Sequence, residues 1–149
     1  NHITDPIMVE KLYEASEAGV DIDLVVRGNC SLITNVPDVS THIRIHGIID
    51  RYLEHSRIFI FANGGEEKIY LGSADWMPRN LDNRIEVAAP VYDKEIQADL
   101  KRIVCYGFRD TAKGRIVDGT GENREKEREE NSVPFRSQEK LYNEYKNTL

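Results

Sequence analysis

One histidine has neighbours of the kind that phosphoryl chemistry needs. His55 stands two residues before Arg57, at the start of an apolar run, and Gly72-Ser73 ends the next apolar run. An imidazole can accept a phosphoryl group, act as a general acid or base, or donate a hydrogen bond to a phosphate oxygen. A guanidinium can bind phosphate oxygens through two hydrogen bonds. A lone histidine is more often structural, but this setting favours an oxygen-anion site at a sheet edge.

Two more arginines lie at the ends of predicted strands. Arg27 ends the run Asp21–Arg27, and Arg84 opens the run Arg84–Val91. Ligand sites of α/β sheets favour the carboxyl ends of strands, and a permanently charged guanidinium suits a polyanion. We expect Arg27 and Arg84 to bind phosphate. A surface salt bridge is the alternative role of each.

A β-hairpin must position the histidine. The apolar runs Arg57–Ala62 and Lys68–Gly72 flank Asn63-Gly64-Gly65, whose residue types supply the positive φ angles of a tight turn. The first run is apolar on both faces, which is typical of a covered central strand. Polar residues should therefore gather at the ends of this strand, where His55 stands.

The rest of the chain predicts an α/β fold, with a mixed sheet flanked by helices. Asp5 is expected to cap a helix that begins at Pro6 and closes at Gly19. The other predicted elements are a strand at Ile43–Ile49, a helical turn at Asp50–Glu54, a helix from Asp93 to near Gly107, a short strand at Lys113–Val117, a charged loop at 119–135 and a last helix at 137–146.

The composition is that of one globular domain over residues 1–149. A net charge of −6 argues against a nucleic-acid-binding protein. Two cysteines, Cys30 and Cys105, are too few for a disulfide framework and suggest a reducing compartment. The sequence has no GxxxxGK[ST], GxGxxG or HExxH motif, and no apolar run that could span a bilayer. Because it begins at Asn1 and enters a helix almost at once, we expect an excised domain.

The hairpin also resembles a phospholipase D half-site, in which His-x-Lys is followed by an aspartate and a Gly-Ser turn. Arg57 replaces the lysine, and Ala62 stands where the aspartate would be expected. Such enzymes join two halves around one phosphohistidine. The departures predict that His55 is the secondary member of the pair, with the nucleophile in another half.

Three blocks carry a more specific resemblance, to the C-terminal, phospholipase D-like domain of long bacterial polyphosphate kinases. They are DPIMVEKLYEASEAGVDIDLVVRGNCSL, IRIHGIIDRYLEHSRIFIFANG and IYLGSADWMPRNLDNRIEV. The resemblance implies reversible transfer of the ATP γ-phosphoryl group to polyphosphate, through a phosphohistidine on a preceding domain that is absent here. It also implies that Arg27 and His55 contact the nucleotide phosphates and that Arg84 is similarly placed. On physical grounds we expect His55 to be catalytic, with a hydrogen bond to the transferring phosphoryl group or to the leaving oxygen of ADP.

Further expectations follow from this resemblance. Magnesium should be required, with its ligands outside this chain. The partners should be ATP or ADP, polyphosphate and the upstream domains of the same chain, without nucleic acid. The full-length enzyme is expected to be a homo-oligomer, and to be cytoplasmic or membrane-associated.

Two other functions stay open. In a phospholipase D-type phosphodiesterase or nuclease, His55 would itself attack, although Arg57 and Ala62 count against this. In a non-catalytic protein, the chain would serve only to bind polyanions or to assemble with a partner. The isolated fragment is expected to be catalytically inactive under the favoured function as well.

Overall fold

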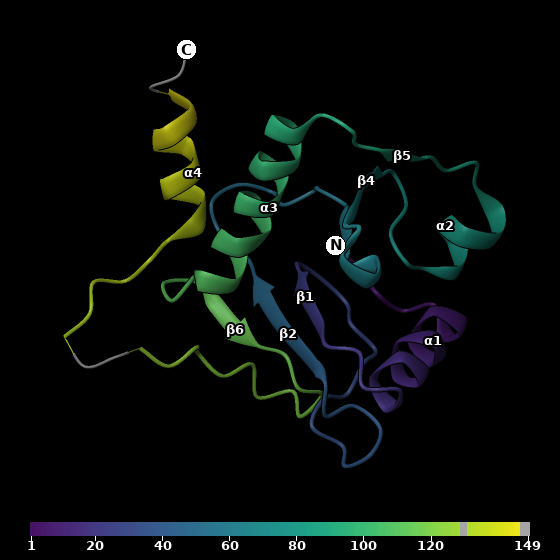
Figure 1. Cartoon of the computed structure of the whole chain (residues 1–149). Helices are drawn as coiled ribbons and strands as arrows, with labels where there is room; N and C mark the ends of the chain where they lie inside the picture. The colour runs from purple at the N-terminus through teal and green to yellow at the C-terminus, as the bar shows by residue number, and fades with distance from the viewer. Residues whose placement is uncertain (129–130, 147–149) are drawn as a thin grey trace.

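Two three-stranded sheets form the centre of the molecule (Figure 1). The computed structural model describes residues 1–128 and 131–146. The first sheet holds β1 (Ile22–Val26), β2 (Ile43–Ile48) and β6 (Gly114–Ile116), and the second holds β3 (Ile58–Phe61), β4 (Lys68–Gly72) and β5 (Ala88–Pro90). The helices are α1 (Pro6–Glu17), α2 (Pro78–Asn83), α3 (Lys94–Arg109) and α4 (Ser137–Lys146).

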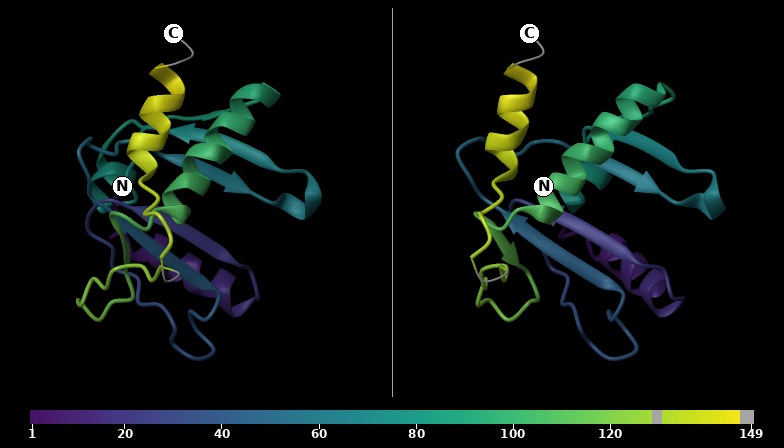
Figure 2. Two further views of the ribbon diagram at one scale, coloured as in Figure 1. Left: turned by 90° about the vertical axis from the view of Figure 1, so that its left-hand side faces the viewer. Right: turned by 60° about the vertical axis from the view of Figure 1, so that its left-hand side comes forward.

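The first sheet is mixed, as predicted. Strand β1 runs parallel to β2, with Ile22 opposite Ile43, and β2 runs antiparallel to β6, with His46 opposite Ile116. Helix α3 contacts this sheet through β1, β2 and β6, and it also contacts β3 of the second sheet, so that it lies alongside both (Figure 2). The predicted α/β class, with sheets flanked by helices, is therefore confirmed.

The second sheet is antiparallel, and β4 is its central strand. The predicted hairpin and its turn are confirmed, because Asn63, Gly64 and Gly65 have φ angles of 46°, 64° and 98°. The prediction of a covered central strand for β3 is wrong. Strand β3 lies at the edge of its sheet, and Phe61 is 53% exposed. An apolar run on both faces does not reveal that the tip of the hairpin projects beyond α3 (Figure 2).

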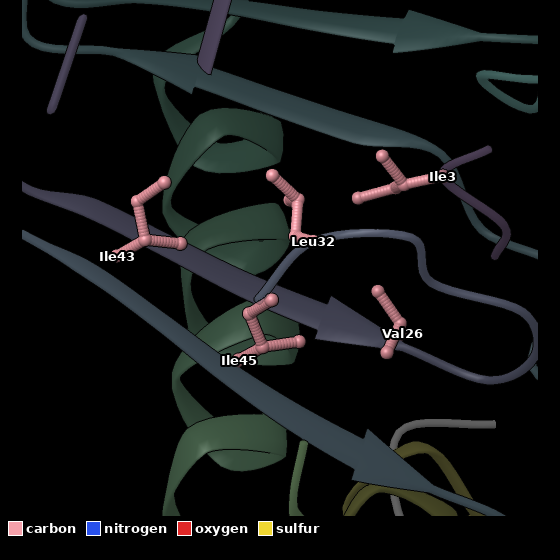
Figure 3. Close-up of a cluster of buried hydrophobic side chains, with 5 residues drawn as sticks. All are labelled: Ile3, Val26, Leu32, Ile43 and Ile45. Atoms are coloured by element: carbon pink, nitrogen blue, oxygen red, sulfur yellow. The ribbon is translucent and has the colours of Figure 1, made fainter. Parts of the chain in front are cut away.

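A short segment at the start of the chain joins the two sheets. Ile3 forms parallel bridges to Cys30 on one side and to Trp76 on the other. Its backbone N–H donates to the carbonyl of Asn29 at 2.9 Å. The Ile3 side chain packs into the core of the first sheet, which Figure 3 shows together with Val26, Leu32, Ile43 and Ile45. The core therefore reaches the seam between the sheets.

The helix caps follow the sequence prediction. The side chain of Asp5 accepts a hydrogen bond from the Met8 backbone at 2.9 Å, at the start of α1. The side chain of Asp93 accepts from Glu95 and Ile96 at 2.9 and 3.0 Å, at the start of α3. Each carboxylate satisfies N–H groups that have no partner within the helix.

Two predicted elements near the hairpin are wrong. Asp50–Glu54 contains no helical turn and has an irregular backbone. Only Ala88–Pro90 of the predicted strand Arg84–Val91 is a strand, and Arg84 follows the end of α2, a helix that the sequence analysis missed. Pro78 at the first helical position is the signal that could have revealed α2. Arg84 is thus not at the mouth of a strand.

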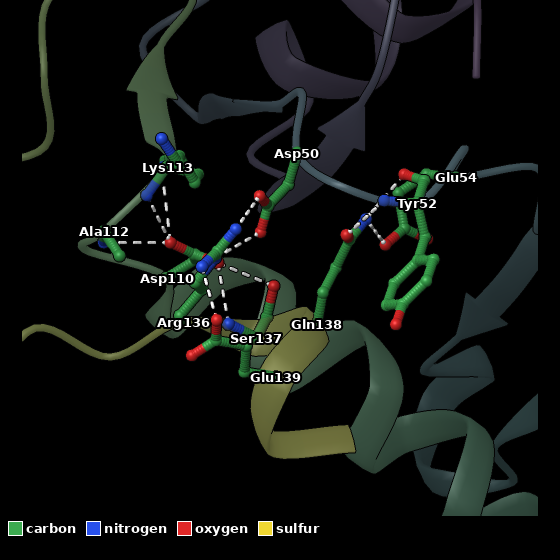
Figure 4. Close-up of polar contacts among 11 residues, drawn as sticks. Asp50, Tyr52, Glu54, Asp110, Ala112, Lys113, Arg136, Ser137, Gln138 and Glu139 are labelled. Atoms are coloured by element: carbon green, nitrogen blue, oxygen red, sulfur yellow. Dashed lines mark hydrogen bonds and ion pairs between the residues drawn. The ribbon is translucent and has the colours of Figure 1, made fainter. Parts of the chain in front are cut away.

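Helix α4 docks on this domain by a polar contact at its N-terminal end (Figure 4). Asp110 is fully buried and accepts hydrogen bonds from the backbone and the hydroxyl of Ser137, both at 2.7 Å. Arg136 donates to both carboxylate oxygens of Asp50 at 2.6 and 2.9 Å. The side chain of Gln138 accepts a hydrogen bond from the backbone N–H of Tyr52 and donates one to its carbonyl. These contacts fix the segment 50–54, which leads directly into His55.

The charged loop is partly ordered against the first sheet. The backbone N–H of Ile116 donates to the carbonyl of Arg124 at 2.9 Å, and the backbone N–H of Lys126 donates to the carbonyl of Gly114 at 3.2 Å. Glu129 and Glu130 of this predicted loop lie outside the described residues. Within the described part of the chain, no helix is long and apolar enough to cross a membrane.

Candidate phosphate site between the two sheets

A cavity of about 170 Å³ lies between the two sheets. Its walls come from β1, β3 and α3, and they are mostly apolar. Charged side chains stand on its lining: Asp23, Arg27, Glu54, Arg57 and Asp75. We call this concavity the intersheet cavity. The sequence singled out Arg27, His55, Arg57 and Arg84, and two of these four, Arg27 and Arg57, line it.

Arg57 is held by Asp75. Its Nε and Nη2 atoms donate to the two carboxylate oxygens of Asp75 at 3.3 and 3.2 Å, and both side chains are 13% exposed. Burial raises the pKa of Asp75, but the hydrogen bonds and charge of Arg57, together with the amino group of Asn1 and the His2 backbone, hold that pKa below the usual range. The carboxylate is therefore charged at neutral pH, and the ion pair is well formed.

His55 lies on the other side of the same guanidinium. Arg57 Nη1 is 2.9 Å from His55 Nδ1 and donates to the His55 carbonyl at 2.9 Å, whereas Nη2 is 3.4 Å from Nε2. The histidine is exposed and does not itself line the intersheet cavity. Arg57 thus connects an accessible imidazole to the cavity wall.

Arg27 follows β1 and lines the intersheet cavity in a half-buried position. Its Nε donates to the side chain of Asn1 at 3.2 Å. No ion pair to a carboxylate is found for Arg27 among residues 1–128 and 131–146. Its charge is therefore available to an anion, and the surface salt bridge considered from the sequence is not formed in the described structure.

Arg84 is separate from this group. It is exposed after the end of α2 and does not line the intersheet cavity. It does lie near Glu86, which accepts hydrogen bonds from Ser73 and Asn80. Those two bonds lower the pKa of Glu86 below its ordinary value, and the charges of Arg84 and Arg57 add to the effect. Arg84 and Arg57 therefore both act on Glu86, although only Arg57 contacts His55.

The sequence placed Asp75 near the hairpin end without revealing a role for it, and it gave no sign of Glu86. Asp75 follows the Gly-Ser turn by two residues, and it faces Arg57 because the backbone of Gly72 pairs with that of Arg57 at 2.9 Å. The signal that could have revealed Asp75 is its negative charge just after β4, opposite the positive charge of Arg57 just before β3. Ala62 stands where a phospholipase D half-site would carry its aspartate, and Asp75 supplies a carboxylate to this group instead.

The described residues do not offer a metal site. Among residues 1–128 and 131–146, no group of three or more histidine, cysteine, aspartate or glutamate side chains is placed to hold an ion. Both cysteines are free, with Cys30 half-buried and Cys105 exposed. Trp76 stacks on Phe59 with ring centroids 5.5 Å apart, so it packs within the protein rather than offering an open face to a base.

Comparison with known proteins gives a consistent result. A family described as polyphosphate kinase C-terminal domain 2 matches residues 1–138. The polyphosphate kinase of Escherichia coli strain K12 is 49% identical over 124 residues, which are 83% of this chain and 18% of that protein. That of Halalkalibacterium halodurans is 45% identical over 138 residues, which are 93% of this chain and 20% of that protein.

A solved structure agrees over nearly the whole chain. The crystal structure of polyphosphate kinase from Porphyromonas gingivalis superposes with a TM-score of 0.92 and 42% identity, and the match covers 99% of this chain and 22% of that one. The chain therefore spans about a fifth of the length of the relatives that it matches.

Proposed function

This chain belongs to the polyphosphate kinase family, as its C-terminal domain 2, and we propose that it supplies one half of the active site of an ATP:polyphosphate phosphotransferase. The family resemblance that the three sequence blocks indicate is confirmed. The reaction would transfer the γ-phosphoryl group of ATP reversibly to a polyphosphate chain. The remaining four fifths of the relatives' length would supply the other half.

The observation that carries this proposal is the contact between His55 and Arg57, beside a cavity that Arg27 also lines. Asp23, Glu54 and Asp75 also line this cavity, and Asp75 neutralises Arg57, so Arg27 is the lining arginine without an ion pair in the described structure. Phosphoryl transfer depends mainly on positioning and on neutralising charge on the phosphoryl oxygens. Fixed guanidinium groups and one imidazole suit that task.

Each predicted residue has a role in this proposal. His55 would donate a hydrogen bond to the transferring phosphoryl group or to the leaving oxygen of ADP. Arg27 would hold phosphate oxygens at the intersheet cavity. Arg84 would act from its own exposed position on the outer part of the substrate, since it does not line the cavity.

Other parts of the reaction would lie on upstream domains. The nucleophilic histidine, which becomes phosphorylated, would come from a preceding domain of the same chain. Magnesium would be held there too, because the described residues offer no fitting group of ligands. ATP, ADP and polyphosphate are the proposed partners, and a homo-oligomer is the proposed state of the full-length enzyme.

The proposal is tested by replacing His55 in the full-length protein. We expect His55→Ala to lower the rate of polyphosphate synthesis by about 100-fold or more, since a group that handles a proton in the transition state contributes about 10²- to 10⁴-fold. His42→Ala is the matched control. His42 is also exposed and hydrogen-bonds Asp21 at 3.1 Å, at the opposite end of the first sheet from Arg27.

The result separates the possible functions. Loss of synthesis in His55→Ala, with an unchanged thermal unfolding midpoint and a normal His42→Ala control, supports the kinase half-site. Normal synthesis by His55→Ala would overturn the proposed role and leave a polyanion-binding module as the better account. Hydrolysis of a phosphodiester without ATP would favour the phosphodiesterase.

A further inference from the structure

Four of the five N–H groups of the Arg57 guanidinium have an acceptor within reach. Nε and Nη2 donate to Asp75, and one Nη1 hydrogen donates to the carbonyl of His55. The other Nη1 hydrogen faces Nδ1 of His55 at 2.9 Å, and the second Nη2 hydrogen has only the more distant Nε2, at 3.4 Å. Arginine has five donors and no acceptor. Arg57 therefore has little capacity left to grip phosphate, which is the role that its residue type first suggests.

The Asp75–Arg57 pair is also fixed from behind. Both side chains are 13% exposed, so water competes weakly for their hydrogen bonds. Nearby residues add to the restraint, because Phe59, two positions after Arg57, stacks on Trp76, which follows Asp75, with an interplanar angle of 10°. The edge of the guanidinium that faces the histidine is thus held at a defined place.

This arrangement sets which ring nitrogen of His55 can carry a proton. A guanidinium only donates, so the ring nitrogen nearest to it must accept. Nδ1 is that nitrogen, at 2.9 Å, whereas Nε2 is 3.4 Å away. A neutral imidazole has one donor and one acceptor nitrogen. The single proton of the neutral ring therefore belongs on Nε2, the nitrogen farther from the backbone.

We propose that Asp75 and Arg57 are positioning residues, which hold the His55 imidazole with Nδ1 as acceptor and Nε2–H as donor. Asp75 fixes Arg57, Arg57 fixes the ring, and only the ring touches phosphate. This inference rests on the proposed function, and it names the nitrogen through which His55 would act. It assigns Arg57 a role distinct from that of Arg27, whose guanidinium contacts the substrate directly.

A double-mutant cycle in the full-length enzyme tests this inference. Arg57→Ala and Asp75→Asn are each made in the native background and in the His55→Ala background, and kcat and KM for polyphosphate synthesis are measured. We expect each to lower kcat by about 10- to 100-fold in the native background, the range found when a partner that orients a functional histidine is removed. In the His55→Ala background we expect less than about 2-fold further loss, because the residue through which they act is absent.

A second variant, Arg57→Lys, distinguishes a positioning role of Arg57 from direct binding of phosphate by its charge. Lysine keeps the positive charge and binds phosphate well, but it cannot bind Asp75 and the imidazole together as the planar guanidinium does. We expect Arg57→Lys to be nearly as impaired in kcat as Arg57→Ala. Thermal unfolding is measured for every variant, and if Arg57→Ala does not fold, the cycle is completed with Asp75→Asn and Arg57→Lys.

The outcomes are distinct. Equal losses in both backgrounds would mean that Arg57 acts independently of His55, and would overturn the inference while leaving the kinase half-site intact. Full activity of Arg57→Ala, or recovery of activity by Arg57→Lys, would overturn it as well. Normal activity of His55→Ala alone would instead overturn the proposed function on which the inference rests.

Discussion

A carboxylate and a guanidinium stand behind the imidazole of His55. The order runs from Asp75, through Arg57, to a ring that is open to solvent. Orientation of this kind matters because a rotatable histidine would spend most of its time with the wrong nitrogen towards the substrate. At the residue scale, the role that we propose for His55 would therefore depend on two side chains that need not touch phosphate.

A different carboxylate makes a residue-scale prediction about pH. Hydrogen bonds from Thr120 and Arg124 lower the pKa of Asp118 from an ordinary value of 3.8 to about 2. A carboxyl group with a lowered folded-state pKa stabilises the protein above its unfolded-state pKa, and that stabilisation is lost as the pH falls through the folded-state value. We expect the denaturation midpoint to fall less steeply between about pH 4 and pH 2 in Asp118→Asn than in the native protein.

The control for this measurement is Asp82→Asn, because Asp82 is exposed on α2. Its pH dependence should match that of the native protein. Parallel curves for the native protein and Asp118→Asn would show that Asp118 has no special role in acid stability.

At the scale of elements, the sequence correctly predicted helices and turns whose ends are set by residues close to them in the chain. The caps at Asp5 and Asp93 predicted α1 and α3, and the Asn-Gly-Gly turn predicted the hairpin. The segment 50–54 was mispredicted because its conformation is set by Arg136 and Gln138, which bond Asp50 and Tyr52 from 86 positions away in the chain. A window of neighbouring residues cannot contain that information.

The same limit explains the site. His55 and Arg27 became candidates from their places near strand ends, whereas the contact of Asp75 with Arg57 became visible only through the pairing of β3 with β4. The prediction that Arg84 begins a strand was wrong. Glu86 accepts hydrogen bonds from Ser73 and Asn80, and the chain turns there after α2 instead of forming a strand. Long-range polar contacts, not local propensity, decided these positions.

Asp110 carries the prediction at this scale. Its buried carboxylate accepts bonds from the backbones of Ala112 and Lys113, as well as from Ser137. Asp110→Asn replaces one acceptor oxygen by a donor that faces other donors. We expect a loss of about 2 to 4 kcal/mol in the free energy of unfolding, together with faster hydrogen exchange of the α4 amides, measured by denaturation and mass spectrometry.

Asp82→Asn is again the matched control, with an expected change within about 0.5 kcal/mol. If Asp110→Asn leaves both the stability and the exchange of α4 unchanged, the docking of this helix does not depend on Asp110. Slower exchange would contradict the account as well.

At the scale of the whole molecule, the two sheets meet at a cavity and not in one continuous layer. Helix α3 lies alongside both sheets (Figure 2), and the backbone of Ile3 forms bridges to Cys30 and Trp76 at the seam. The cavity is lined by Arg27 from one sheet and by Arg57 from the other. The fold therefore brings two arginines from distant parts of an acidic chain to one place, where under the proposed function Arg27 would bind phosphate and Arg57 would hold His55.

The most direct test of this account measures the affinity of the full-length protein for a non-hydrolysable ATP analogue by calorimetry. Arg27→Ala is compared with Arg115→Ala, which removes an arginine on β6, at the opposite edge of the first sheet from β1. The account predicts at least about 10-fold weaker binding for Arg27→Ala, since a hydrogen bond to a charged group contributes about 1.5 to 3 kcal/mol, and an unchanged affinity for Arg115→Ala. Equal affinities of Arg27→Ala and the native protein would contradict a phosphate site between the sheets.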